Sequence, residues 1–223
     1  MSITAESTVG TVATEHPLAT RVFARHGIDF CCGGGQPLAA ACEARGVDVE
    51  RVLGEIEEEI AGRDSEETRW DEEPLDALID HILAAYHRPL DEELPRIEEM
   101  ARKVHGVHGE KDRARFDALL ETVLAVKSDI EQHMPKEEMI LFPMIRAGQG
   151  GNATGPMHVM EMEHDTLAGL LRKLRSLTNG YVVPQEACNT WRALWVALED
   201  LERSLHEHIH LENNILHPRA RRQ

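Results

Sequence analysis

The sequence predicts an all-α protein in which an up-down-up-down four-helix bundle follows a small helical domain. Two observations predict this fold class. Strand signals are scarce, because aromatic residues make up only 4% of the 223 residues and no alternation of valine and isoleucine is bounded by turns. Apolar residues instead recur at helical spacing, and the second part of the chain holds long amphipathic segments joined by short connections.

The first part of the chain reads as short helices around a glycine-rich loop. Helical spacing covers residues 11–26, 37–45 and 48–60. Gly27 and Gly46 end the first two of these segments. The loop at residues 28–35 contains two adjacent cysteines followed by three glycines.

An acidic stretch separates the two parts. Residues 43–73 hold thirteen acidic and four basic side chains, which is typical of a solvated linker. We therefore place a small helical domain at residues 1–65 and the bundle at residues 72–223, with the boundary near 62–72.

The four long segments each carry one apolar stripe. They cover residues 75–104, 112–146, 157–177 and 184–216. In chain order, the predicted core stripes are Ile79, Leu83, His87, Leu90 and Leu94; Val126, Ile130, His133, Glu137, Ile140 and Met144; Met157, Met160, His164, Leu167, Leu171 and Leu174; and Leu194, Leu198, Leu201, Leu205, His208, Glu212 and Ile215. A histidine thus interrupts every stripe, and two stripes add a glutamate one turn later.

These interruptions predict a metal site. One histidine on an apolar face reads as a hydrogen-bonded core residue, but a buried carboxylate is costly unless it is paired or bound to metal. The predicted ligands are His87, His133, Glu137, His164, His208 and Glu212. Six nitrogen and oxygen donors are too many for one tetrahedral zinc and suit iron or manganese. We expect two metals about 3.5 Å apart, with both glutamates bridging and positions left for an oxo bridge and a ligand such as O2 or NO.

An internal repeat supports this ligand set. The segments that start at His133 and His208 both read His-x3-Glu-x2-Ile-Leu-x-Pro, so His and Glu share one helix face in each. Pro135 lies between ligands of the first copy, and we expect a kink or bulge there. Glu138, Glu163, Asp165 and Glu207 are candidates to orient the imidazoles, although a solvated face explains each equally well.

Other metal motifs fit less well. The run from His206 to His210 contains the His-Glu-x-x-His pattern of zinc proteases, but His206 and His210 align with charged residues and should face solvent. A ferritin-like site needs two Glu-x-x-His motifs on different helices; Glu161 and His164 provide one, and we take that arrangement as incomplete here. Asp91, one turn after His87, is a further possible ligand.

The adjacent thiols of Cys31 and Cys32 are candidate catalytic groups. Three functions suit them: thiol–disulfide redox chemistry, metal transfer, or docking onto another metal site. A glycine turn with incidental thiols is the competing explanation. For Cys42 and Cys188, packing is the expected role.

The charge balance and the cysteine count exclude several classes of protein. A net charge of −16 disfavours nucleic acid as a partner. The sequence contains no run of about 18 apolar residues, so no membrane span is predicted, and the first ten residues do not resemble a signal peptide. Four cysteines do not form an extracellular disulfide framework. We therefore expect a cytoplasmic protein.

Three segments carry a family resemblance. The first His-x3-Glu segment, the run Val159–Asp165 and the segment His208-x3-Glu212-Asn213-Asn214 resemble the hemerythrin-like di-iron domain. The loop around Cys31 and Cys32 resembles the N-terminal domain of the RIC (repair of iron centres) family. The resemblance spans about residues 8–220 in the family's order. It places the ligand role on the same six residues and the family's cysteine pair on Cys31 and Cys32.

The resemblance implies a function. It indicates a protein with two non-haem irons, joined by an oxo or hydroxo bridge, that repairs iron–sulfur clusters after oxidative or nitrosative stress, by supplying iron. An NO reductase and an O2 or NO carrier or sensor remain alternatives. The implied partners are damaged iron–sulfur proteins and O2 or NO, with a homodimer left open. The resemblance also places His108 near the site.

Overall fold

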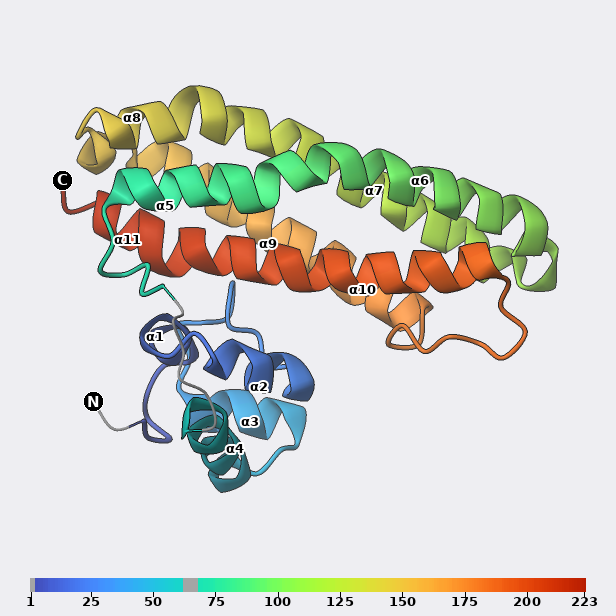
Figure 1. Cartoon of the computed structure of the whole chain (residues 1–223), viewed down its shortest axis with the longest axis horizontal. Helices are drawn as coiled ribbons and strands as arrows, with labels where there is room; N and C mark the ends of the chain where they lie inside the picture. The colour runs from blue at the N-terminus through green and yellow to red at the C-terminus, as the bar shows by residue number, and fades with distance from the viewer. Residues whose placement is uncertain (1–2, 62–67) are drawn as a thin grey trace.

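The computed structural model describes residues 3–61 and 68–223 and confirms the all-α fold. Within these residues there is no strand, and one isolated bridge joins Thr8 to Pro37. Figure 1 shows a long bundle with a small helical unit against one side. The core of the predicted linker, residues 62–67, lies outside the described residues, so the domain bounds 1–65 and 72–223 stay a prediction.

Four short helices build the small unit. They are α1 (Val9–Glu15), α2 (Ala19–His26), α3 (Leu38–Arg45) and α4 (Val49–Ala61). The single helix predicted at 11–26 is two helices, because Pro17 lacks an N–H group and disfavours helical backbone at His16, whose φ and ψ are −134° and 78°. Gly27 and Gly46 end α2 and α3 with positive φ angles of 64° and 66°, as predicted.

Each long segment of the bundle is built from several helical pieces. The pieces are α5 (Leu75–Ile82), η1 (Leu83–His87), α6 (Arg88–His108), η2 (Gly109–Lys111), α7 (Arg113–Lys136), η3 (Glu137–Leu141), α8 (Phe142–Arg146), η4 (Gly150–Asn152), α9 (Thr154–Leu177), α10 (Asn189–His210), η5 (Leu211–Leu216) and α11 (His217–Ala220). Among them η1, η3 and η5 are π-helical turns, in which each bond reaches five residues back, and η2 and η4 are 3₁₀ turns.

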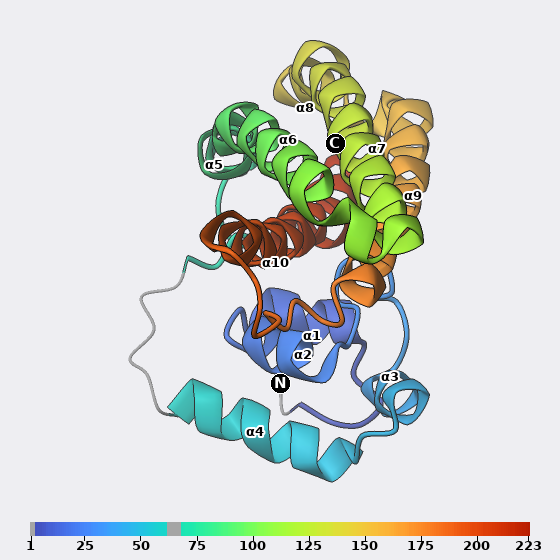
Figure 2. The same ribbon diagram turned by 90° about the vertical axis from the view of Figure 1, so that its right-hand side faces the viewer.

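The long helices form the predicted up-down-up-down bundle. Helix α6 packs against α7 and α10, and α9 packs against α7 and α10, so the four close around one core (Figures 1 and 2). The first long helix continues to His108, four residues beyond the predicted end, with Gly106 inside the helix. The fourth begins at Asn189 rather than at 184, after Cys188 in extended backbone.

Two of the four predicted core stripes are buried throughout, those of α9 and of α10 with η5. The stripe of α7 and η3 is wrong at its end: Ile140 is 51% exposed, Met144 is only half-buried, and Leu141 and Phe142 are buried instead. On the first long helix, Leu83 is likewise only half-buried. Leu83 and Ile140 lie inside the π-helical turns η1 and η3, and Met144 follows η3; each such turn adds a residue and breaks the 3.6-residue period.

The small unit lies against the last long helix (Figure 2). Contacts join α1 to η5, and the Phe30 ring meets the rings of His206 and His210 at centroid distances of 6.1 and 5.7 Å. Cys31 is buried in the core cluster of the bundle itself. In the described part of the chain, no helix is long and apolar enough to cross a membrane.

Candidate metal centre

The six predicted ligands meet in one cluster inside the bundle. They come from every long helix: His87 from η1, His133 from α7, Glu137 from η3, His164 from α9, His208 from α10 and Glu212 from η5. All six are buried, with exposed fractions of 8% or less. Their donor atoms form two groups of four that share both glutamates, and within each group all donor atoms lie within 4.8 Å of one another.

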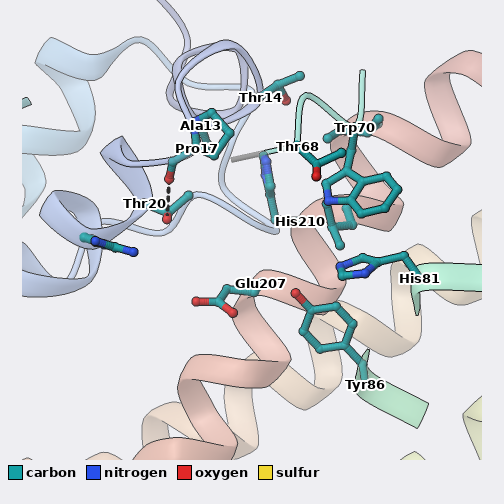
Figure 3. A pocket seen from close by; sticks show the side chains of 13 residues that line it. Ala13, Thr14, Pro17, Thr20, Thr68, Trp70, His81, Tyr86, Glu207 and His210 are labelled. Carbon is teal, nitrogen blue, oxygen red and sulfur yellow. Dashed lines mark hydrogen bonds between the residues drawn. The ribbon is translucent and has the colours of Figure 1, made fainter. Parts of the chain in front are cut away.

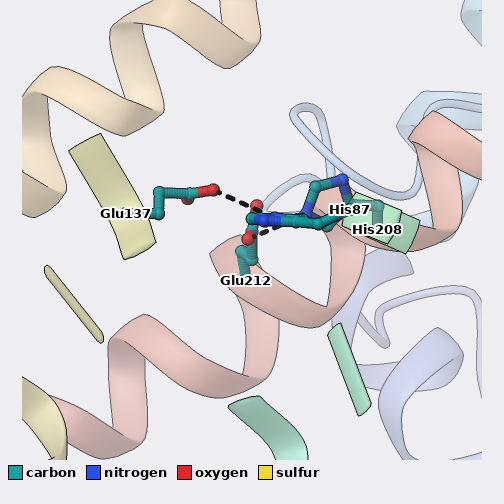
Figure 4. Close-up of side chains that lie close together, drawn as sticks. All are labelled: His87, Glu137, His208 and Glu212. Atoms are coloured by element: carbon teal, nitrogen blue, oxygen red, sulfur yellow. Dashed lines mark hydrogen bonds and ion pairs between the residues drawn. The ribbon is translucent and has the colours of Figure 1, made fainter. Parts of the chain in front are cut away.

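The first group joins His87 and His208 (Figure 4). The two Nε2 atoms are 3.2 Å apart. Glu137 Oε2 lies 3.4 Å from His87 Nε2, and Glu212 Oε1 lies 2.9 Å from His208 Nε2. Four donor atoms thus converge on one small volume.

The second group repeats this pattern with His133 and His164. Their Nε2 atoms are 3.1 Å apart. Glu137 Oε1 lies 3.3 Å from His133 Nε2, and Glu212 Oε2 lies 3.2 Å from His164 Nε2. Each carboxylate therefore directs one oxygen to each histidine pair.

Two carboxylates outside the cluster fix the orientation of two imidazoles. His87 Nδ1 lies 2.9 Å from Glu138 Oε1, and His133 Nδ1 lies 2.9 Å from Glu163 Oε2. A carboxylate can only accept, so both imidazoles donate from Nδ1 and turn Nε2 inward. A cation holds each of these carboxylates: Arg88 Nη2 is 2.7 Å from Glu138, and the Lys136 ammonium pairs with Glu163.

The other two imidazoles have different surroundings. His164 Nδ1 donates to the side-chain oxygen of Asn213 at 2.9 Å. His208 Nδ1 is buried without a hydrogen-bond partner, and the Tyr86 ring stacks on this imidazole with centroids 5.3 Å apart and planes within 9°. Each histidine pair therefore combines one imidazole held by a carboxylate with one that is not.

These donors fit a divalent cation. Both oxygens of Glu137 and one of Glu212 are buried without a hydrogen-bond partner, although imidazole nitrogens lie close by. Burial and Glu212 act to raise the pKa of Glu137, but His133 and His87 outweigh them and lower it to about 2. Burial acts to lower the pKa of His133, yet Glu137, Glu212 and Glu163 raise it to about 9. Anionic oxygens and imidazole nitrogens that converge in a dry volume are the donor set of a metal site, in which a bound cation would replace the Nε2 protons.

Two cavities reach the surroundings of the cluster. One, of about 350 Å³, lies between the small unit and the bundle, and Figure 3 shows the side chains of Pro17, Trp70, His81 and Tyr86 around it. The Trp70 ring stacks on the His81 ring with centroids 4.2 Å apart. Tyr86, which also lines this cavity, stacks on the ligand His208.

The second cavity is smaller and lies on the opposite histidine pair. Its volume is about 150 Å³, and its lining includes His133, His164, Lys136, Glu163 and Gln132. It therefore contacts two of the six predicted ligands directly.

Several sequence candidates lie away from the cluster. Asp91 is exposed and pairs with Arg88 at 3.4 Å, and Asp165 is exposed. The prediction for His108 is wrong: it ends α6, about 30 Å along the helix from His87 at 1.5 Å per residue, and its Nε2 is 3.3 Å from Cys188 Sγ. Packing was expected for Cys188, but this residue is exposed. Cys42 is buried as expected.

The expected solvent-facing position of His206 and His210 is also wrong. His210 is 5% exposed, and both rings contact Phe30 of the small unit. The charged face of α10 is covered because the small unit packs on it, which the period of one helix cannot reveal. Neither residue joins a potential metal cluster in the described residues.

The cysteine loop lies beside this face. Cys31 Sγ is 3.3 Å from Asp29 Oδ1 and 3.8 Å from Cys32 Sγ. The Cys32 thiol, burial and Asp29 hold the pKa of Cys31 well above its usual range, so in this position the group is a thiol. Cys32 is partly exposed.

Sequence reasoning missed Arg88, Lys136, Tyr86 and Asn213 as neighbours of the ligands. Arg88 and Tyr86 each adjoin His87, and Asn213 follows Glu212, so proximity to a ligand was the available signal. Glu138 and Glu163 were among the candidates to orient imidazoles, and both are in that position.

Known families match both parts of the chain. The Hemerythrin HHE cation binding domain matches residues 78–220, and the ScdA_N domain, a domain of unknown function (DUF542), matches residues 5–60. The chain is 42% identical to the iron-sulfur cluster repair protein YtfE of Yersinia pseudotuberculosis serotype IB (strain PB1/+) over 214 residues, which cover 96% of each chain. The protein of the same name from Yersinia pestis (strain Pestoides F) matches with the same identity and coverage.

Proposed function

This chain belongs to the hemerythrin HHE cation-binding family and, over 96% of its length, to the family of the iron–sulfur cluster repair protein YtfE, and we propose that it repairs clusters damaged by oxidative or nitrosative stress by supplying iron from a di-iron centre. Membership of the hemerythrin family makes it a non-haem iron-binding protein. Its targets in this role are damaged iron–sulfur proteins, and the delivered iron is the cargo.

The observation that carries the di-iron centre is the direction of the four carboxylate oxygens. Glu137 and Glu212 each direct one oxygen to each histidine pair, so both suit a bridging role. His87 and His208 would hold one iron, and His133 and His164 the other. When bound, the iron pair supplies one-electron redox chemistry and open positions for a small ligand.

The surrounding residues prepare this site. Glu138 and Glu163 accept hydrogen bonds from two imidazoles at Nδ1, which directs the Nε2 atoms to the metal positions. Arg88 and Lys136 keep those carboxylates charged. Because all six ligands are buried, water is largely excluded from the donor atoms.

A second candidate function is NO reduction or reversible binding of O2 or NO. The cavity of about 150 Å³ beside His133 and His164 favours it, because a diatomic ligand fits that volume and would approach the ligands directly. Cys31 and Cys32 distinguish the two functions. Replacing both by Ala should abolish repair of an NO-inactivated iron–sulfur enzyme and leave reversible gas binding intact.

Metal analysis of anaerobically purified protein tests the centre. We expect about two irons per chain in the wild type and fewer than one in Glu137→Ala and in Glu212→Ala. Asp91→Ala is the matched control, because this exposed carboxylate lies one turn from His87 without joining the cluster. One zinc that survives both glutamate substitutions would contradict the proposed ligands.

A further inference from the structure

Three consecutive residues of η5 reach three different partners. Glu212 belongs to both donor groups of the metal centre. Asn213 accepts a hydrogen bond from the ligand His164 at 2.9 Å. Asn214 donates from Nδ2 to two backbone carbonyls of the cysteine loop, Phe30 O at 3.3 Å and Cys31 O at 3.0 Å. One short turn thus contacts the metal cluster, a ligand's imidazole and the thiol-bearing loop.

The position of the Asn214 side chain requires glycine at two neighbouring positions. A Cβ at Gly10 would lie 2.5 Å from Asn214 Oδ1, and one at Gly34 would lie 2.8 Å from the same atom. Gly10 N also donates to Gly34 O at 2.7 Å, which holds the two glycines together around the side chain. The glycine at 34 is therefore required by the close approach of Asn214 to the loop.

A second residue of the same helix holds the loop. The His210 ring is buried, its Nδ1 donates to Phe30 O at 3.2 Å, and its edge packs on the Phe30 ring. His210 lies between the ligands His208 and Glu212 in sequence. The contacts that fix the loop and those that fix the metal therefore alternate along residues 208–214.

The docked loop hides its first thiol. Cys31 is 2% exposed and packs in the core of the bundle, whereas Cys32 is half-buried. A reagent or an acceptor protein reaches Cys31 only when the loop leaves α10 and η5. Access to this thiol therefore depends on the contacts of Asn214 and His210.

We propose that η5 couples metal occupancy to the accessibility of Cys31 and Cys32. Metal bound to His208 and Glu212 fixes the turn from which Asn214 holds the loop, and loss of metal releases the loop. The coupling is reciprocal, because a docked loop also stabilises the helix that binds metal. The inference rests on the proposed function and deepens it: departure of iron would itself present the thiol pair.

Alkylation by N-ethylmaleimide, resolved for each cysteine by mass spectrometry of the peptides, tests the coupling. The full chain is compared without metal and with about two equivalents of ferrous iron under anaerobic conditions. We expect iron to slow alkylation of Cys31 and Cys32 at least about fivefold. Cys188 is exposed and distant, so its rate should not change, and Cys42 in the core of the small unit should react slowly in both states.

Substitution of Asn214 separates coupling from direct iron–thiol binding. Asn214→Asp keeps the size of the side chain but replaces the donor to Phe30 O and Cys31 O by an acceptor. At saturating iron we expect the iron content to stay at the wild-type value, although the affinity falls by the coupling factor, while Cys31 in the loaded protein reacts as fast as in metal-free protein. Asn152→Asp, the same change at an exposed turn, should keep the protection.

Three results would overturn the proposal. In the first, the wild type binds iron and repairs clusters and yet shows equal alkylation rates with and without metal. This result would refute the coupling and leave the proposed function standing. Protection that persists in loaded Asn214→Asp would show that Asn214 does not carry the coupling. A wild type that holds no iron would refute both. If Asn214→Asp also exposes Cys42, the small unit has unfolded, and the wild-type comparison decides.

Discussion

The two halves of the bundle are built from the same four helices but differ in helix geometry and in the polarity of their cores. In the half around Phe116, Trp191 and Trp195, the helices are regular and the core is apolar, with Trp191 5.2 Å from Phe116 and 5.6 Å from Trp195 between ring centroids. In the half around the ligands, three of the four helices contain a π-helical turn, and the core holds histidines and glutamates. Burial of apolar side chains in the first half stabilises the bundle, and this offsets the cost of burying polar donors in the second half.

Proline accompanies each wide turn. The last bond of each turn is donated five residues back, from Arg88 to Leu83, from Phe142 to Glu137 and from His217 to Glu212. The residue after each donor is proline, which has no N–H group and clashes with the carbonyl four residues before it. Pro95 and Pro135 lie inside ordinary helix, so proline alone does not widen a turn. Each of the three wide turns instead contains one of the predicted ligands, His87, Glu137 or Glu212.

The largest effect on stability should come from the apolar half. Trp195→Ala removes a fully buried ring, and we expect the free energy of unfolding to fall by about 3–5 kcal/mol. The iron content of the protein that remains folded should not change. Urea denaturation and metal analysis measure the two quantities. A loss of iron in proportion to the loss of stability would show that the halves are not separable.

Metal should stabilise the ligand half selectively. At free ferrous iron about a hundred times the dissociation constant, we expect a gain of about 2.7 kcal/mol in the free energy of unfolding. In hydrogen exchange, the added protection should concentrate at η1, η3 and η5. Glu212→Ala should lose the gain. Equal added protection around Trp191 would contradict the comparison.

Removing a proline should affect binding more than folding. Pro143→Ala restores an N–H donor after η3 and permits a regular turn, which would rotate Glu137 relative to His133. We expect iron affinity to fall at least about tenfold, as for other losses of ligand positioning. Pro95→Ala is the control, because this proline lies in α6 without a wide turn, and its iron titration should match the wild type.

The sequence was sufficient for the helices and for the six clustered residues, because the apolar period and its interruptions are local. It was insufficient at the wide turns, which contain Ile140 and Leu83, two residues that were assigned to the core. The proline of the repeated motif is visible in the sequence, but only a structure shows that it accompanies a wide turn, which shifts the helical register of the side chains. The covered face of α10 at His206 and His210 could not be predicted, since the contact joins residues about 180 apart in sequence.

The smallest effect should be a difference in acid sensitivity. His217 and Arg221 lower the pKa of Glu161 to about 2 from an ordinary value of 4.5. The folded-state pKa is below the unfolded one, so this carboxylate stabilises the fold above pH 4.5, and its contribution is lost as the pH falls toward 2. In metal-free protein, Glu161→Gln should therefore flatten the decline of unfolding free energy below pH 4.5.

Asp117→Asn provides the matched control in the other half. Its pKa is also lowered, by His105 and Arg113, but the carboxylate lies on the exposed surface. The flattening should be smaller than for Glu161→Gln. A larger change for Asp117 would reverse the assignment of the acid-sensitive contact to the ligand half.

The position of η5 also sets an order for biosynthesis. The small unit is translated first, yet the residues that hold its cysteine loop, His210 and Asn214, are translated nearly last. The same stretch contributes His208 and Glu212, so neither donor group is complete until it has left the ribosome. The nascent chain therefore carries an undocked pair of thiols through most of its synthesis, and docking of the loop and completion of the metal centre become one late event.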